Sequence, residues 1–430
     1  MYLRVQGSEF ALRGKPIRLR GVGLGGWLNL EHFMLGIPGT ETEIRSAFEA
    51  VYGHEASARF WDAFFAIYTA ESDLRFVREL GLNSLRVPVN FKRFALTDGD
   101  SEGDFSTSVA VRELDRVVAI AERLGLLVIF DLHSAPGGQN PDWHCDNATG
   151  NSSFWTNPGH RANVTRLWEQ LAARYRDNTT VAGYDLINEP CYFDDALSSV
   201  LVDFYATCIE AIRRIDPHHI IFVEGNTYAR DFSMFERNLD DQVAYSFHYY
   251  PFLQIPSDLG STTEATRLRE SLFADVSLDH LRNSLKRPLW CGETGHPQHL
   301  PQSVSAFDRF LRLLEGLGIS WAVWPLKDAR AMGLLSPKEQ SPWMQFIGRT
   351  ADDFKFWDLF TQDSVLSAKK ESRRELYYER LAGVTSDANA RFKERLEKIP
   401  FEVPFSALSS FGFAACEQQL ELTALLRRFT

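Results

Sequence analysis

Short apolar runs that end in polar residues alternate along the chain with longer segments whose apolar residues recur every three or four positions. The short runs are typical of buried strands, and the longer segments are typical of amphipathic helices. Eight strands are predicted in this way, at residues 17–24, 83–89, 126–132, 182–188, 219–225, 242–250, 288–294 and 319–325. Helices are predicted between several of them, at residues 72–81, 111–125, 164–177 and 307–318.

Strands that alternate with helices pair in parallel, and each is then buried on both faces. Eight such units predict an α/β protein with a (β/α)₈ (TIM) barrel. A doubly wound open sheet is the alternative. No glycine-rich phosphate loop follows any predicted strand, so a nucleotide-binding sheet is the less attractive interpretation.

The chain of 430 residues is long for one domain, but barrels with enlarged loops reach this size. We therefore expect a single domain over residues 1–430. Residues 1–16 alternate like a hairpin, and residues 326–372 form a long loop after the eighth strand. Residues 401–430 are expected to pack on the barrel as a C-terminal tail.

Charge and cysteine content narrow the class further. A net charge of −11 argues against a nucleic-acid partner, which needs clustered Lys and Arg. The five cysteines are far apart and form no CxxC pair, which predicts free thiols in a reducing compartment. The N-terminus lacks an apolar signal core, and no apolar stretch has membrane-spanning length, so we expect a cytoplasmic protein. Four N-x-[ST] triplets matter only if the chain is secreted, at Asn147, Asn151, Asn163 and Asn178.

Polar residues gather where the predicted strands end, and in a barrel those ends form the active-site face. They are Arg86, Asp131, His133, Asn188, Glu189, His248, Tyr250, Glu293 and Trp324. Glu189 and Glu293 follow the fourth and seventh strands, which face each other across the barrel mouth. Glycoside hydrolysis needs such a pair, one carboxyl to protonate the leaving oxygen and one carboxylate to attack or to position water.

Each of these residues also has a purely structural interpretation. A glutamate at a strand end can be a surface residue or half of an ion pair, and Arg86 can bridge strands. His133 and His248 can be hydrogen-bonded core residues. Trp324 can belong to the core, although an indole at a strand end also offers a stacking surface for a sugar ring.

Seven segments together resemble glycoside hydrolase family 5, in order and spacing, over most of residues 15–330. They are GVGLGGWLNLE, LRVPVN, DLHSAPGGQN, YDLINEP, HYY, CGETG and the tryptophan of WAVWP. The resemblance implies a retaining mechanism, with Glu189 as acid/base and Glu293 as nucleophile. It further implies that Asn188 binds the sugar 2-hydroxyl and that Arg86 and Tyr250 orient and ionise the nucleophile. His133 and His248 would line the subsite of the cleaved sugar, and Trp324 would form its floor.

Within that family, GGWLNLE and DLHSAPGGQN are closest to the exo-β-glucanase and β-glucosidase branch. The resemblance implies that Glu31 grips the terminal sugar and that Asp146 and Asn147 close the pocket. WPLKD and the long loop depart from that pattern, and Lys327 and Asp328 either contact substrate or form a loop ion pair.

The expected function is that of an exo-acting retaining β-glycosidase for β-linked glucosides or short β-glucans, without a cofactor. An endo-acting β-glycanase, or a glycosidase for a mannoside, xyloside or galactofuranoside, remains open, as does the oligomeric state.

Two other classes are weaker. A metal-dependent barrel hydrolase would use His133, His144 and His248, but no strand begins with an H-x-H pair and no histidine pair with carboxylate has ligand spacing, so no metal is predicted. A non-catalytic carbohydrate-binding barrel would usually lack one of the two carboxylates, and both are present.

Overall fold

The computed structural model describes residues 1–95, 105–251, 262–297, 303–329, 331–350, 374–408, 413–414 and 417–429. Eight parallel strands close into a barrel in the order β10-β11-β4-β5-β6-β7-β8-β9. Their bounds are β4 Arg20–Gly23, β5 Ser84–Asn90, β6 Leu127–Ser134, β7 Val181–Asp185, β8 Ile220–Glu224, β9 Val243–His248, β10 Leu289–Thr294 and β11 Ser320–Val323. Each lies within or overlaps one predicted strand, and the predicted TIM barrel is confirmed.

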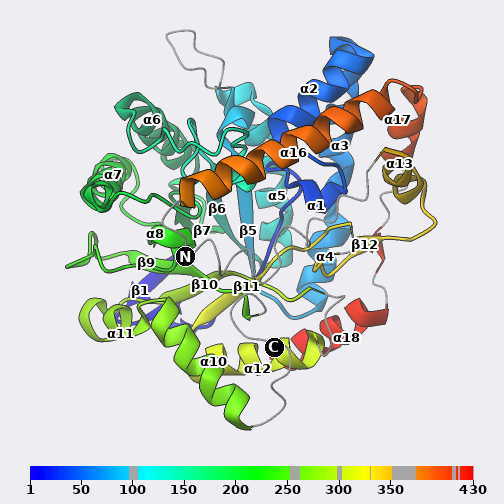
Figure 1. The fold of residues 1–430 in the computed structure, drawn as a ribbon. Coiled ribbons are helices and arrows are strands. Elements are labelled where there is room, and N and C mark those ends of the chain that lie inside the picture. Colours follow the sequence, from blue (N-terminus) through cyan, green and yellow to red (C-terminus); the bar gives the residue numbers. More distant parts are fainter. Residues whose placement is uncertain are drawn as a thin grey trace.

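Helices surround the strands (Figure 1). Those in the connections are α1 His32–Leu35, α2 Glu41–Tyr52, α3 His54–Tyr68, α4 Glu71–Glu79, α5 Val109–Leu124, α6 Pro158–Tyr175, α7 Ser198–Arg213, α8 Asn226–Ala229, α10 Thr262–Asp275, α11 Leu278–His280 and α12 Ser303–Gly316. Short 3₁₀ helices are η1 Phe91–Phe94, η2 Phe105–Thr107, η3 Trp143–Cys145 and η4 Asp195–Leu197. The segment η5, Leu281–Leu285, is a short π-helix. The four predicted helices correspond to α4, α5, α6 and α12.

Local sequence explains where these helices begin and end. The Ser108 side chain accepts the Val111 N–H at the start of α5, and Gly125 ends that helix in the left-handed conformation. Thr40 and Glu43 form a capping box at the start of α2. Helices α2 and α3 were not predicted between the first two barrel strands.

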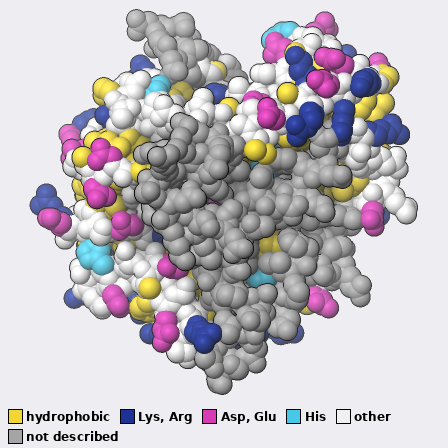
Figure 2. All heavy atoms as spheres, in the orientation of Figure 1, with side chains coloured by type: hydrophobic (Ala, Val, Ile, Leu, Met, Phe, Trp, Pro, Cys, Tyr) yellow, Lys and Arg dark blue, Asp and Glu magenta, His cyan; other side chains and the backbone are white. Residues whose placement is uncertain are grey.

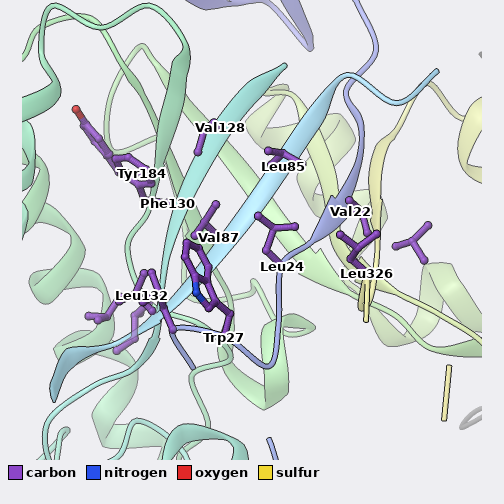
Figure 3. Close-up of a cluster of buried hydrophobic side chains, with 14 of the residues drawn as sticks. Val22, Leu24, Trp27, Leu85, Val87, Val128, Phe130, Leu132, Tyr184 and Leu326 are labelled. Atoms are coloured by element: carbon purple, nitrogen blue, oxygen red, sulfur yellow. The ribbon is translucent and has the colours of Figure 1, made fainter. Parts of the chain in front are cut away.

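Side chains along each barrel strand point alternately outward, into the core between strands and helices, and inward, into the barrel interior. On β6, Val128, Phe130 and Leu132 belong to the core between strands and helices, and the Phe130 ring lies 4.8 Å from that of Tyr175 on α6. Figure 3 shows these β6 side chains near Leu85 and Val87 of β5. The intervening residues of both strands point to the barrel interior, because successive side chains alternate in direction.

The N-terminal hairpin is part of a three-stranded antiparallel sheet made of β1 Leu3–Gln6, β2 Glu9–Leu12 and β3 Lys15–Ile17. Leu3 and Phe10 pack with Phe222 and Trp290 in a second buried cluster at the beginning of the barrel strands. This sheet therefore closes the barrel at the end opposite to the site.

The segments after β11 wrap back onto the outer helices. They are β12 Ser336–Pro337, α13 Pro342–Thr350, α16 Arg374–Leu396, α17 Glu402–Leu408, β13 Phe413–Ala414 and α18 Glu417–Leu426. Helix α16 passes across α2, α17 contacts α3 and α13, and α18 contacts α12 (Figure 1). The predicted 326–372 loop thus contains a helix, and its residues 330 and 351–372 lie outside the described ranges.

Acidic and basic side chains are mixed over the described part of the face shown in Figure 2. Among the helices of the described residues, none combines the length and the apolar character needed to cross a membrane.

Candidate active site

Arg86 lies at the centre of a buried ring of acidic side chains inside the barrel. Its guanidinium donates to Glu293 Oε1 at 2.5 Å and to Asn188 Oδ1 at 2.8 Å. Three more carboxylates from neighbouring strands lie 3.1 to 3.2 Å from it, those of Asp131, Asp185 and Glu224. Burial would lower the pKa of Arg86, but these negative charges raise it well above its usual value. The cluster holds a permanent cation beneath the site.

Glu293 is fixed by two donors. Besides Arg86 on Oε1, the Tyr250 hydroxyl donates to Oε2 at 2.8 Å. Burial, together with the negative charges of Glu293 and Glu189, raises the pKa of Tyr250 well above its ordinary value, so its hydroxyl keeps the proton that it donates. Each carboxylate oxygen of Glu293 therefore accepts one hydrogen bond, Oε1 from Arg86 and Oε2 from Tyr250, and the two bonds fix its orientation.

The residue before Glu293 has to be small. A Cβ at Gly292 would lie 2.6 Å from Ser246 Oγ and 3.1 Å from His248 Nε2. The glycine of the CGETG segment thus leaves the space in which the His248 ring sits beside Glu293.

Glu189 follows β7 in a left-handed backbone conformation with φ of 47°. His248 Nδ1 lies 2.8 Å from its Oε1, and His144 Nε2 lies 3.3 Å from its Oε2. Burial raises the pKa of Glu189, but the hydrogen bond and charge of His248, followed by the charges of His144 and His133, lower it to about 2. The charge of His248 therefore favours the anionic form of Glu189, and the surrounding carboxylates in turn raise the pKa of His248 well above its ordinary value against the effect of burial.

The two glutamates approach each other closely. One carboxylate oxygen of Glu189 and one of Glu293 lie within 4.8 Å. Retaining glycosidases keep their carboxyl groups about 5–5.5 Å apart, whereas inverting enzymes need roughly 6.5–9.5 Å to admit a water molecule. The close approach of this one pair of oxygens agrees with the retaining arrangement.

An aromatic wall stands beside the carboxylates. The Trp324 indole stacks on the His133 ring with centroids 5.3 Å apart and an angle of 13°. A Cβ at Gly23 would lie 2.3 Å from this indole, and one at Gly25 would lie 2.7 Å from it. The glycines of the GVGLGGW segment therefore make room for the ring.

His133 connects this wall to Glu31. Its Nδ1 lies 2.8 Å from Asp131 Oδ2, and its Nε2 lies 3.5 Å from Glu31 Oε1. Burial lowers the pKa of His133, but the charge and hydrogen bond of Asp131, with Glu31 and Glu293, raise it to about 10. Burial raises the pKa of Glu31.

Asp146 and Asn147 have contacts that join loops. Asp146 accepts from the Thr42 backbone N–H and hydroxyl at 2.7 Å and pairs with Lys92 at 2.9 Å. Asn147 donates to the backbone carbonyls of Asn140 and Asn151 at 2.9 Å. These bonds secure the loop after β6, and the geometry gives no support to a direct sugar contact by either side chain.

Lys327 forms the ion pair that the sequence left open, but with a distant residue. Its Nζ lies 2.6 Å from Asp73 Oδ2 and 2.8 Å from the Tyr68 carbonyl oxygen, in a buried position. Asp328 instead accepts the N–H groups of its own loop, including those of Met332 and Gly333 at 2.7 Å. The ammonium of Lys327 thus anchors the loop after β11 to the start of α4.

Three residues of the site were not assigned to it from the sequence: Asp185, Glu224 and His144. Asp185 and Glu224 are the last residues of the buried strands β7 and β8, and their side chains point into the barrel. A carboxylate at the end of a buried strand is the one sequence signal that could have assigned them to the site. His144 lies in the loop after β6, and nothing local indicates that it reaches Glu189.

One group in the described part of the chain has metal-ligand spacing, formed by Glu189, His248 and Glu293. It includes neither His133 nor His144, which were considered as ligands from the sequence. The Arg86 guanidinium already compensates Glu293, and the imidazoles compensate Glu189.

Comparison with known proteins places residues 39–330 in the Cellulase family model, glycosyl hydrolase family 5. A β-xylosidase from Phanerodontia chrysosporium is 35% identical over 364 residues, which cover 80% of this chain and 74% of that protein. A probable glucan 1,3-β-glucosidase A from Emericella nidulans is 32% identical over 206 residues, 46% of this chain and 49% of the relative. The chain therefore aligns with about half of that second relative.

Solved structures share the barrel. The endoglucanase Cel5A from Thermotoga maritima superimposes with a TM-score of 0.52, covering 74% of this chain and 91% of its own. At 18% sequence identity, this similarity concerns the fold alone.

Proposed function

Because the chain belongs to glycosyl hydrolase family 5, we propose that it is a retaining, exo-acting β-glycosidase that hydrolyses β-linked glucosides or short β-glucans. Glu293 attacks the anomeric carbon while Glu189 protonates the leaving oxygen, and Glu189 then takes a proton from the water that releases the sugar. The observation that carries this mechanism is the approach of the two carboxylates to within 4.8 Å, with Glu293 oriented by Arg86 and Tyr250.

Substrate contacts follow from the walls of the site. Asn188 is held by Arg86 beside Glu293, where its amide can reach the 2-hydroxyl of the sugar. Trp324 and His133 supply the flat and polar surfaces of the subsite, and Glu31 supplies a hydrogen-bonding carboxyl at its inner end. Pyranose C–H groups stack favourably on an indole.

Exo action is supported by two loops that pack together on one side of the site. The His32 and Trp143 rings lie 4.1 Å apart, and Asn29 donates to the His144 carbonyl oxygen at 3.2 Å. Ser134 donates to Asn29 Oδ1 at 2.6 Å. The loop after β4 and the loop after β6 thus form one wall, which would block further sugar units on that side.

A β-xyloside is the second candidate substrate. The Phanerodontia β-xylosidase aligns with 80% of this chain, whereas the glucan 1,3-β-glucosidase aligns with 46%. The two sugars differ by the hydroxymethyl group on C5, so the choice depends on the space around that carbon.

A panel of aryl β-glucosides, xylosides, mannosides and galactofuranosides, with oligosaccharides read for product length, tests the substrate. We expect single sugars to be released from one end with the β-anomer formed first in NMR spectra. Oligosaccharide products from early time points would establish endo action, and an α-anomer formed first would refute the retaining mechanism.

The roles of the two glutamates are tested by substitution and azide rescue. Glu189→Ala and Glu293→Ala should each lose at least about 100-fold in turnover, the usual contribution of such groups. Azide should restore turnover with a β-azide product in the first variant and an α-azide product in the second. Activity that survives EDTA excludes a metal mechanism, and a wild-type protein that binds sugars without turnover would be a carbohydrate-binding barrel.

A further inference from the structure

Glu224 is a fully buried carboxylate at the end of β8 that touches both halves of the site. Its Oε2 accepts the Glu189 backbone N–H at 2.6 Å. Its Oε1 accepts from Arg86 Nη2 and from Ser246 Oγ, each at 3.2 Å. It therefore contacts the backbone of one glutamate and the arginine that holds the other.

The same Oε1 faces the far nitrogen of His248. His248 Nε2 lies 3.1 Å from Glu224, in ion-pair range although off the ideal hydrogen-bond direction. The near nitrogen, Nδ1, lies 2.8 Å from Glu189 and 3.6 Å from Glu293. The imidazole is thus placed between carboxylates on both edges, and a lone pair on either nitrogen would face a negative charge.

We propose that Glu224 is a positioning residue that keeps the Nε2 proton on His248, so that His248 can pass its Nδ1 proton to Glu189. The inference rests on the proposed acid/base role of Glu189. In the transfer the Nδ1–H bond breaks and an Oε1–H bond forms on Glu189. His248 is left neutral with its remaining proton toward Glu224, and no proton enters or leaves the site.

This transfer resolves a conflict in the resting state. Glu189 has its pKa lowered to about 2, chiefly because His248 offsets the effect of burial, yet an acid catalyst must carry a proton. The required proton lies one hydrogen bond away, on Nδ1. Without Glu224, a neutral His248 would hold its single proton toward Glu189, and passing it on would leave the ring with none.

The charged groups around His248 come from four strands and one loop. Glu224 extends from β8, Glu293 from β10 and Glu189 from the loop after β7. Asp185 of β7 acts on the ring through space, and Arg86 of β5 faces it across Glu224. Among these anions Glu224 is the one that meets Nε2, so its charge sets the tautomer.

Glu224 also holds the backbone of Glu189. A left-handed backbone conformation is unfavourable for a residue other than glycine. A short hydrogen bond from its N–H to a carboxylate offsets part of this cost. The Tyr205 hydroxyl bonds the Glu224 backbone at 2.8 and 3.1 Å, which fixes the end of β8.

The test is the pH dependence of kcat/KM in Glu224→Gln, measured with two β-glycosides of the sugar that the wild type cleaves best. One carries 2,4-dinitrophenolate, which leaves without acid help, and the other carries methanol, which needs it. We expect kcat/KM to fall about 100-fold for the methyl glycoside and less than about 3-fold for the dinitrophenyl glycoside. The alkaline limb should move toward acid by about 1 pH unit, because one opposite charge beside His248 is lost.

Asp185→Asn is the matched control. Like Glu224→Gln, it removes a buried carboxylate that pairs with Arg86, here at 3.1 Å from Arg86 Nε. Unlike Glu224, Asp185 does not contact His248. Because Asp185 acts on His248 only through space, the alkaline limb of Asp185→Asn should move less than that of Glu224→Gln, and its ratio between the two substrates should stay at the wild-type value. Equal losses on both substrates in Glu224→Gln, or an unmoved limb, would reduce Glu224 to a structural residue and overturn the proposal.

A wild-type measurement guards against a variant that does not fold. In ¹⁵N spectra of histidine-labelled protein, the resonance lost in His248→Gln should report both ring nitrogens protonated at pH 7. A ring with a bare Nε2 would overturn the proposal. If Glu189→Gln keeps wild-type kcat/KM on the methyl glycoside, the proposed function itself fails, and that outcome is distinct from the failure of Glu224 alone.

Discussion

Arg86 shows how one residue can join a whole site. It is fully buried and faces four carboxylates and one amide from five different segments of the barrel. A buried charge is tolerated only when its partners are close and hydrogen-bonded, and removal of one partner leaves the others uncompensated. The stability of the barrel and the orientation of Glu293 therefore depend on the same guanidinium.

Replacing Arg86 by Met should lower the free energy of unfolding by about 3–5 kcal/mol and abolish most turnover, because several carboxylates lose their cation. Urea denaturation measures the first effect. The control is Arg174→Met, which breaks a half-exposed pair with Asp115 and should cost about 0–1 kcal/mol. Similar losses in both variants would contradict the assigned importance of the buried cluster.

The pKa of His133, which Asp131 raises to about 10 against the effect of burial, predicts a pH-dependent stability. A raised pKa in the folded protein means that the stabilisation is complete below the ordinary value of 6.5 and is lost as the pH rises through 10. Unfolding free energies between pH 6 and pH 10 should fall more steeply for the wild type than for His133→Gln. Parallel curves would show that His133 is neutral in the fold.

At the scale of residues, alternation along the strands and the seven segments were enough to select most of the groups that meet at the barrel mouth. They did not give the partners of Glu224, Asp185 or His144. The reason is physical: the sequence around a carboxylate at a strand end is the same whether the side chain faces a cation or solvent. Likewise, the partner of Lys327 is Asp73, which lies 254 residues earlier in the chain.

At the scale of elements, the barrel strands were predictable because each is a short apolar run bounded by polar residues. The long connection from β4 to β5 was not, since α2 and α3 lie outside the repeating strand–helix unit. Their place becomes clear only from their partners: the Phe392 ring of α16 lies 6.1 Å from that of Phe48 on α2, and Trp343 of α13 donates to the Leu35 carbonyl oxygen at 3.0 Å.

Strand β4 carries the element-scale prediction, because its Gly23 backs the indole of Trp324. Gly23→Ala would place a Cβ 2.3 Å from the ring, so we expect a loss of about 1–3 kcal/mol in stability and a higher KM as Trp324 moves. Gly316→Ala is the control: nothing lies within 4 Å of its Cβ, and it sits at the end of α12, where alanine is the better helix former. Denaturation and KM measured on both variants check the prediction, and an unchanged KM in Gly23→Ala would contradict it.

At the scale of the whole molecule, the two ends of the barrel have different tasks. The ends of the strands carry the charged site, and the beginnings are closed by the β1–β3 sheet through Leu3 and Phe10. In barrels of this kind, residues at the closed end serve stability and those at the open end serve chemistry.

Phe10→Ala should therefore destabilise the protein by about 3–5 kcal/mol while leaving KM unchanged well below the melting temperature. The Phe10 ring lies 5.9 Å from that of Phe222 and is 2% exposed, so its removal leaves a cavity. Leu420→Ala, at a position that is 58% exposed, should change little. A raised KM in Phe10→Ala would show that the two ends are coupled.

The Arg86 cluster also has a consequence for synthesis on the ribosome. Glu293 is joined to the growing chain 207 residues after Arg86. A nascent chain that ends before β10 carries three of the four carboxylates that face Arg86, but it lacks Glu293 and the two strands, β10 and β11, that close the ring. The edges of strands β4 and β9 therefore stay unpaired until β10 and β11 have been synthesised. During this interval the N-terminal half exposes the apolar faces of its strands. It is therefore the part of the nascent chain that most needs a chaperone.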